Sequence, residues 1–314
     1  MNNIQHQEMV KRAVKAKFHG HDTLQGKAVP AYPVTAEREL RRITGGYMKL
    51  LNQVLRENLP AMMAAYKRER HGDSRFDDSR DLDNEIRQTI QKMSAELERL
   101  LAEYGLDDQV RKVSKTAQNT SLREWKRMVR NTLGIDLTTD YFKGDFYGDA
   151  IEKWISQNIL LIKSLPTETL GNMRQILLDS YMKGKPIRQI QKDIQEEYNV
   201  SKRRAALLAR DQIASLNAQI TKLQHQDAGV KKYRWSSSKD SRVRECHAEL
   251  DGKVFSWDDP PEMWYDTKSK GRVYTGRFCH PGEDICCRCV AIPVFDQNTV
   301  DLPISSSGEL RIGR

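Results

Sequence analysis

The sequence has no apolar run long enough to cross a membrane. Its longest candidates, such as residues 159–162, are only four or five residues long, whereas a membrane-spanning helix needs roughly 18. The N-terminus also lacks the apolar core of a secretory signal peptide. We therefore expect no membrane association and no Sec-dependent export, so that the chain meets a reducing cytoplasm.

Signatures of common enzyme classes are missing as well. The chain has no G-x-x-x-x-G-K-[ST], G-x-G-x-x-G or H-E-x-x-H, the usual patterns of nucleotide hydrolysis, dinucleotide binding and zinc proteases. His247 with Asp240 or Asp251 could form a general base with its orienting carboxylate, and Arg288 could lower the pKa of the Cys287 thiol. Neither pattern comes with a partnered serine or a glycine-rich loop. We therefore predict a protein that is not an enzyme and has no small-molecule substrate.

Cysteine is scarce, and four of the five cysteines fall within residues 279–289. Reducing conditions argue against a disulfide framework. One metal scheme takes His247, Cys279, Cys287 and Cys289, because thiolate and imidazole are the usual ligands of a structural zinc ion. The spacing is unusual, since a single residue separates Cys287 from Cys289. Buried reduced thiols and a disulfide formed outside the cell are the alternatives to one structural zinc.

Apolar residues make up only 38% of the chain, while charged residues make up 30%. This balance, in a length that fits about two domains, favours long solvent-exposed helices over one thick core. Apolar residues recur at helical spacing between residues 35 and 229. Within this region we predict that Pro166 ends one helix, that Ser201 caps the start of another, and that residues 68–83 form a loop or a frayed helix end.

The pattern changes at Gly229. Residues 232–236 and 290–295 have strand composition, and Asp251-Gly252 is a turn signal. The predicted fold class is a mainly α N-terminal helical region followed by a small α+β C-terminal module with short strands. The predicted divisions are a flexible basic arm without periodicity (1–34), a helical region (35–229), the module (230–300) and a tail (301–314).

The excess of positive charge lies in the helical part of the chain. The formal net charge is +9, yet residues 230–300 hold twelve Lys/Arg against eleven Asp/Glu, and residues 301–314 balance. Short basic groups such as Arg38, Arg41 and Arg42 are usually solvated helix faces, but they also suit salt-sensitive contact with phosphate backbones. No zinc-finger spacing or RNA-recognition aromatic motif accompanies them. The candidate nucleic-acid residues are Lys11, Arg12, Lys15, Lys202, Arg203 and Arg204.

Residues 210–295 carry several motifs in a characteristic order. W-x-x-x-x-D begins at Trp235, H-x-x-L-D-G-K begins at His247, and Pro281-Gly282 precedes the C-R-C run. In this order and spacing the motifs resemble the Mu F-like head morphogenesis family, the minor head proteins of tailed bacteriophages. The family's characteristic positions in this sequence are Trp235, Asp240, His247, Asp251, Gly252, Pro281, Gly282, Cys287, Arg288 and Cys289.

The resemblance implies a minor structural protein of the phage head, associated with the portal and other capsid or scaffold components inside the procapsid. The implied location is the capsid interior of the virion near the portal vertex, after assembly in the host cytoplasm. Some relatives contact packaged DNA, so non-specific contact with the DNA backbone is implied too. Cys246 and Cys286 lie outside the family pattern, which narrows the metal scheme to His247, Cys287 and Cys289 with Cys279 or water.

Two other functions are compatible with these residues. A zinc-dependent nucleic-acid enzyme acting during packaging would use His247, Asp240 and Asp251 around an open metal position. A plain DNA-binding protein would lose affinity steeply as salt rises. Some Mu F-like modules are joined to C-terminal toxin domains, but only about twenty residues follow residue 295, so we expect no toxin domain.

Overall fold

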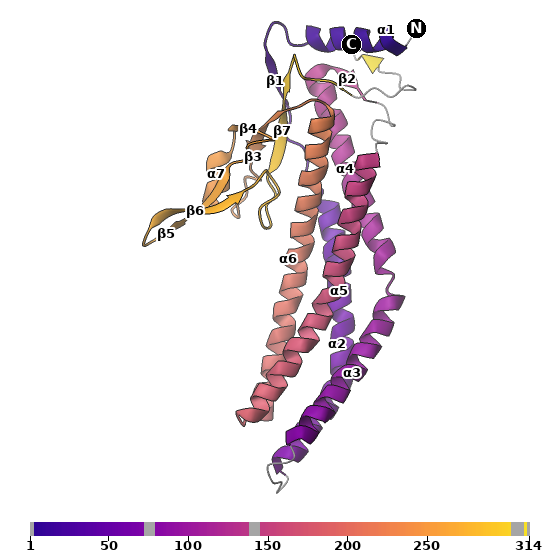
Figure 1. Ribbon diagram of the computed structural model, residues 1–314, viewed down its shortest axis with the longest axis vertical. Helices are drawn as coiled ribbons and strands as arrows, with labels where there is room; N and C mark the ends of the chain where they lie inside the picture. Colours follow the sequence, from indigo (N-terminus) through magenta and orange to yellow (C-terminus); the bar gives the residue numbers. More distant parts are fainter. Residues whose placement is uncertain (1–2, 72–78, 138–144, 303–310, 313–314) are drawn as a thin grey trace. The chain divides into compact units, whose positions relative to one another are not determined.

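The computed structural model describes residues 3–71, 79–137, 145–302 and 311–312 (Figure 1). These residues form the helices α1 (Asn3–Ala16), α2 (Val34–His71), α3 (Ser79–Glu103), α4 (Leu106–Leu133), α5 (Asp145–Met182), α6 (Ile187–Asp227) and α7 (Glu245–Leu250). They also form the strands β1 (Thr23–Gln25), β2 (Ile135–Asp136), β3 (Lys232–Ser236), β4 (Val254–Ser256), β5 (Glu262–Thr267), β6 (Gly271–Phe278), β7 (Val290–Asp296) and β8 (Arg311–Ile312). The predicted fold class is confirmed, because long helices precede a small module of short antiparallel strands.

The chain divides into two compact units. The first comprises residues 1–36, 114–154 and 211–314, and the second comprises residues 37–113 and 155–210. This division differs from the predicted boundary at Gly229, because the last part of α6 packs with the strands. Asp211 of α6, for example, accepts a hydrogen bond of 2.7 Å from the backbone N–H of Cys286.

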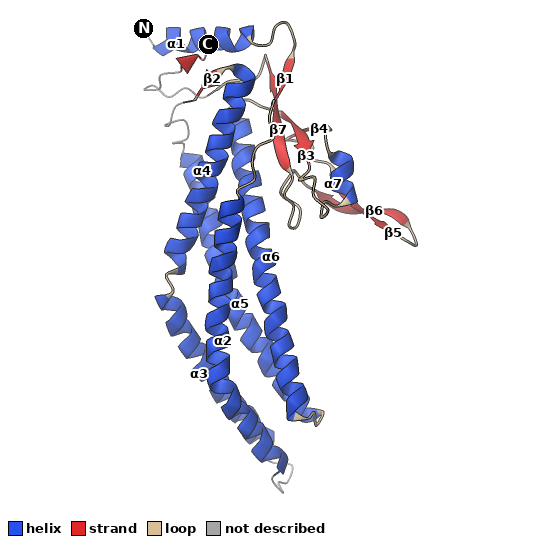
Figure 2. Ribbon diagram, turned by 180° about the vertical axis from the view of Figure 1, so that it is seen from behind, coloured by secondary structure: helices blue, strands red, loops and turns tan. Residues whose placement is uncertain are grey.

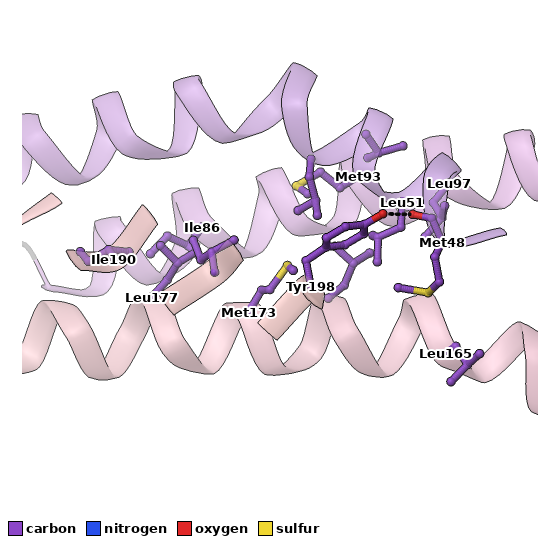
Figure 3. Packing of buried hydrophobic residues seen from close by; sticks show 14 of the residues in the cluster. Met48, Leu51, Ile86, Met93, Leu97, Leu165, Met173, Leu177, Ile190 and Tyr198 are labelled. Carbon is purple, nitrogen blue, oxygen red and sulfur yellow. Dashed lines mark hydrogen bonds between the residues drawn. The ribbon is translucent and has the colours of Figure 1, made fainter. Parts of the chain in front are cut away.

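The second unit is a helical core. Its buried apolar side chains come from α2, α3, α5 and α6, and the hydroxyl of Tyr198 donates a 3.1 Å hydrogen bond to the carbonyl of Met48 (Figure 3). Burying one such side chain contributes roughly 1.5–3 kcal/mol. The core residues labelled in Figure 3 are Met48, Leu51, Ile86, Met93, Leu97, Leu165, Met173, Leu177, Ile190 and Tyr198. No helix among the described residues combines the length and the hydropathy that crossing a membrane requires.

Two predicted helix ends are wrong. α5 continues through Pro166, although proline removes a backbone donor and costs about 3 kcal/mol in a helix interior. Apolar residues on both sides of it, Leu165 and Leu170, are buried in the core, and their burial outweighs that cost. Ser201 lies inside α6 rather than at its start, because the apolar stripe that begins at Ile187 runs on without a break.

A loop or a frayed helix end was predicted over residues 68–83, and the described residues at both ends of this range are helical. α2 extends to His71 and α3 begins at Ser79, while residues 72–78 lie outside the described residues. High charge alone did not indicate a loop, since a charged segment remains helical when its neighbours on the same helix are buried.

The predicted flexible arm is instead folded into the first unit. Phe18, just after α1, is fully buried with Trp125 and Phe295, and β1 pairs with β7 in antiparallel register, Leu24 opposite Phe295. The predicted tail also contributes, because Leu302 is buried in the same cluster. Among the described side chains of α1 and the turn after it, the apolar residues that face this core are Val14 and Phe18, which are too few to give a periodic signal.

The first unit contains a four-stranded antiparallel sheet in the order β1-β7-β3-β4 (Figure 2). The predicted strands 232–236 and 290–295 are confirmed as β3 and β7, paired with Trp235 opposite Ala291. Pro293 fits this central position because its carbonyl accepts a bond from Gly26. Its nitrogen therefore faces the β1 side, where the pairing with β7 has ended, and no bond to β3 is lost. The other pairs are β5 with β6 and β2 with β8.

Gly229 connects α6 to β3 and cannot be replaced easily. Its φ is +66°, a left-handed conformation that favours glycine. A Cβ there would lie 1.9 Å from the carbonyl oxygen of Thr299. The backbone of the segment after β7 thus passes directly over this turn.

His225 is a buried neutral histidine in the first unit. Its ring lies between Trp125 and Trp257, with centroid distances of 5.3 and 5.4 Å, and burial lowers its pKa to about 3. The unfolded chain binds a proton at this residue below about pH 6.5, whereas the folded chain does not. The histidine therefore destabilises the fold as pH falls from about 6.5 toward 3.

We expect the free energy of unfolding of His225→Phe to depend less on pH below about pH 6.5 than that of the wild type. Between pH 6 and pH 4 the free energy of unfolding of the wild type should fall more steeply, by up to about 1.4 kcal/mol per pH unit. Denaturant unfolding at several pH values measures this difference. The control is His21→Gln, at an exposed histidine, and its free energy of unfolding should vary with pH as that of the wild type does. If the free energy of unfolding of His225→Phe fell with pH as steeply as that of the wild type, His225 would not be the buried neutral histidine responsible for the acid sensitivity.

Candidate metal centre

Three predicted ligand residues meet in the first unit. His247, Cys287 and Cys289 are each buried, and one ligand atom from each lies within 4.8 Å of the others. The Nδ1 atom of His247 is 3.5 Å from the Cys287 sulfur and 3.7 Å from the Cys289 sulfur. The imidazole and both sulfurs therefore face a common point.

Backbone geometry orients the cysteine pair. The N–H groups of Gly282 and Cys289 each donate to the sulfur of Cys287 at 3.4 Å. Gly282 has a φ of +89°, and a Cβ on it would lie 3.0 Å from Ala218 and 3.2 Å from the Ala214 carbonyl of α6. This close approach explains why glycine suits the position: it lets the loop before Cys287 rest on the helix.

The other motif residues hold His247 and its helix, α7. Trp235 is fully buried, with its ring 5.5 Å from that of His247, and its backbone bonds Gly252 and Lys253. The carboxylate of Asp251 accepts the N–H of Ser237 at 2.8 Å. The Asp251-Gly252 turn that ends α7 is thus fastened to β3, with Gly252 at a φ of +81°.

Asp284 completes the group, and sequence reasoning missed it. Its buried carboxylate accepts hydrogen bonds of 2.8 Å from both Arg244 and Arg277, and lies 3.3 Å from the Nε2 atom of His247. That last approach is off the hydrogen-bond direction, so the contact with His247 is electrostatic. In the sequence, Asp284 is marked only by its position three residues before Cys287.

The charges of the group are strongly coupled. The hydrogen bond with Cys289 and the adjacent His247 overcome burial and lower the pKa of Cys287 to about 5. The contact with Cys287 raises the pKa of Cys289 well above its usual range. Burial opposes protonation of His247, but Asp284 and Cys287 raise its pKa to about 9. Burial is likewise overcome at Asp284, where His247 and the two arginines contribute to a pKa of about 2.

Arg288 is not the cause of the low Cys287 pKa, contrary to the sequence expectation. Its guanidinium contacts the carboxylate of Asp240, which Arg242 also binds at 3.2 Å. The ion pair between Arg288 and Asp240 links the segment after β3 to the loop that carries Cys287 and Cys289. The thiolate of Cys287 instead depends on Cys289 and His247.

The remaining predicted ligands and bases lie elsewhere. Cys279 is outside the three-residue group, and burial raises its pKa to about 11. Cys246 contacts the sulfur of Met263. Asp240 and Asp251, the carboxylates considered for a nucleic-acid enzyme, bind arginine and backbone partners instead of joining His247. The three donors are of the types that bind zinc, thiolate and imidazole, and a carboxylate commonly lies beside a ligating histidine.

The candidate nucleic-acid residues differ in their partners. Lys11 and Arg12 of α1 lie 3.7 Å from Asp301 and 3.9 Å from Glu8, and Arg204 of α6 lies 3.6 Å from Glu168. Within the described part of the chain, no ion pair is found for the remaining three, Lys15, Lys202 and Arg203.

Residues 172–292 match the protein family described as Phage Mu protein F like protein. This segment is a Mu F-like region. The resemblance drawn from the motifs is thus confirmed, and all ten characteristic positions, from Trp235 to Cys289, fall within the matched residues. The match begins in α5, further toward the N-terminus than the motifs indicated.

Two curated proteins share part of the chain. An uncharacterized protein of Haemophilus influenzae is 35% identical over 170 residues, which are 54% of this chain and 35% of that protein. The NAD(+)--arginine ADP-ribosyltransferase EFV of Enterococcus faecalis is 27% identical over 133 residues, 41% of this chain and 26% of that protein. The chain thus aligns with about a third or less of the length of each relative. No solved structure matches the chain.

Proposed function

We propose that this chain is a minor structural protein of a tailed-phage head that acts in head morphogenesis. The observation that carries the proposal is the Mu F-like match over residues 172–292. The structure supports it by giving the motif residues structural roles: Gly282 seats a loop on α6, and Asp251 fastens a turn to β3.

We further propose that the chain binds the portal and other capsid or scaffold components inside the procapsid, near the portal vertex. Helix α5 offers a surface for such contact, because Leu160 is 68% exposed and its neighbour Leu161 is 41% exposed. Two adjacent exposed leucines on a long helix suit a partner that covers apolar surface.

The test is recovery of the portal with the chain. An affinity-tagged copy, expressed in induced cells that carry the phage, should co-purify with portal protein in particles of procapsid size. The double substitution Leu160→Ser/Leu161→Ser should reduce the portal recovered without lowering the thermal stability. Recovery of the tagged chain free of portal and capsid proteins would refute the proposal.

We propose that the chain has no transferase activity of its own. The name of the Enterococcus relative describes that whole protein, of which this chain aligns with 26%. The aligned length of 133 residues is close to that of the Mu F-like match, so the shared part is proposed to be the structural region. Purified chain should therefore transfer no ADP-ribose from NAD⁺ to an arginine substrate; measurable transfer would contradict this.

We also propose that His247, Cys287 and Cys289 hold one structural zinc ion. The donors suit the metal, because two sulfurs and one imidazole nitrogen face a common point in a buried site, and water would supply the fourth ligand. When bound, the ion would join α7 to the loop that precedes β7. Asp284 would then orient His247 through its second ring nitrogen.

A non-specific contact with the backbone of packaged DNA is the last part of the proposal. The formal net charge of +9 favours it. Such contact is sensitive to salt and does not depend on base sequence.

A further inference from the structure

A basic hollow lies between α2 and α6 in the second unit. Its volume is about 440 Å³, and it is lined by Arg41 and Gly45 of α2 and by Asn199, Lys202, Arg203 and Ala206 of α6. On α2 the lining residues are four apart, and on α6 they follow helical spacing, so each helix presents one face to the hollow.

The hollow is a built feature of the fold. A Cβ on Gly45 would have no atom within 4 Å, and Ala206 adds only a methyl group, so small residues leave the space open. Hydrogen bonds hold the two helices beside it: Thr44 donates to the Ala205 carbonyl at 3.2 Å, and Tyr198 donates to the Met48 carbonyl at 3.1 Å. The spacing between the two helices is therefore set before a ligand arrives.

The cations of the hollow carry no counter-charge from the described residues. Arg41, Lys202 and Arg203 are exposed, and none forms an ion pair with a carboxylate in the described part of the chain. Their immediate neighbours do: Arg42 lies 2.7 Å from Glu39, and Arg204 lies 3.6 Å from Glu168. On each helix, an arginine without an ion pair is followed by one that is paired with a glutamate, and it is the arginine without an ion pair that lines the hollow.

We propose that this hollow binds the phosphodiester backbone of nucleic acid, with Arg41, Lys202 and Arg203 as the phosphate contacts. Guanidinium groups match phosphate oxygens with two parallel hydrogen bonds, and lysine adds a point charge. Exposed Arg38, one turn before Arg41 on α2, extends the positive surface beyond the hollow, as a backbone of repeating charge requires. The inference rests on the proposed DNA contact and assigns it to the second unit.

The experiment measures binding of the full-length protein to a labelled random-sequence DNA duplex by fluorescence anisotropy across a salt series. The double substitution Arg41→Ala/Arg203→Ala should weaken binding and reduce the slope of log affinity against log salt by about 2. The matched control Arg42→Ala/Arg204→Ala also removes two positive charges, one from the same turn of each helix. It should change the slope less, because those side chains are paired with glutamates.

A second pair of variants changes Gly45, which lines the hollow and has open space in front of it, and keeps all the basic side chains. Gly45→Glu places a carboxylate in open space and should weaken binding, whereas Gly45→Ala should leave binding unchanged. Thermal melts establish that both variants fold.

Three outcomes would overturn the assignment: equal slopes for the two double substitutions, no effect of Gly45→Glu, or displacement of the duplex by a glutamate-rich peptide at lower concentration than by unlabelled DNA. None of these outcomes bears on whether the chain is part of the phage head, because that is tested separately by analysing purified particles.

Discussion

Cys287→Ser is expected to abolish zinc binding by the purified full-length protein, which should otherwise carry about one zinc ion per chain. The sulfur of Cys287 faces the His247 Nδ1 at 3.5 Å and accepts two backbone N–H groups. Its low pKa keeps it in the thiolate form that binds metals. Cys289→Ser and His247→Gln should have the same effect on metal content.

Loss of the ion should also destabilise the first unit, because a ligand set from α7 and the loop before β7 joins two separate segments. We expect the free energy of unfolding to fall by about 3 kcal/mol or more. Elemental analysis after gel filtration gives the zinc content, and chelator titration gives the stability change. The controls are Cys246→Ser and Cys279→Ser, which lie outside the group and should keep the zinc. A wild type without zinc, or equal loss in Cys279→Ser, would contradict the proposal.

Asp284→Ala is expected to destabilise the protein by about 2–3 kcal/mol. Its side chain is 3% exposed and contacts Arg244, Arg277 and His247. Removing the carboxylate of Asp284 leaves the buried His247 without this partner, which is costlier than losing an exposed pair, whereas Arg244 and Arg277 are about half exposed and remain solvated. With zinc bound, the same substitution should weaken metal retention about tenfold to a hundredfold, because it frees the histidine ring to reorient.

The matched control for Asp284 is Asp240→Ala. Asp240 also lies between two arginines, Arg242 and Arg288, but its side chain is 32% exposed. Solvent screens such a pair, so the loss should be about 1 kcal/mol. Denaturant unfolding of both variants at pH 7 provides the comparison. Equal stability of the two variants would show that Asp284 is not the centre of the buried charge group.

The parts of the fold that could be predicted from the sequence depend on local signals. β3 and β7 lie where strand composition indicated them, and the Asp251-Gly252 turn follows α7 because glycine adopts a positive φ there. The helical stripes likewise became the core of the second unit. Pro166 and Ser201 were misjudged because their local tendencies to end or start a helix were outweighed by burial of neighbouring residues.

The candidate site was only partly predictable for the same reason. His247, Cys287 and Cys289 stood out through residue type and family spacing. Asp284 did not, because its importance comes from Arg244, which is 40 residues away, and from the burial of its carboxylate. Such contacts are created by the tertiary fold and leave no periodic pattern in the sequence.

The central claim, that the chain is a structural component of phage heads, is tested most directly by quantitative mass spectrometry of purified procapsids and mature heads. We expect peptides of this chain in both particles, in few copies relative to the major capsid protein and in a fixed ratio to the portal protein. Detection of the chain in the infected-cell lysate together with its absence from both kinds of particle would contradict the account.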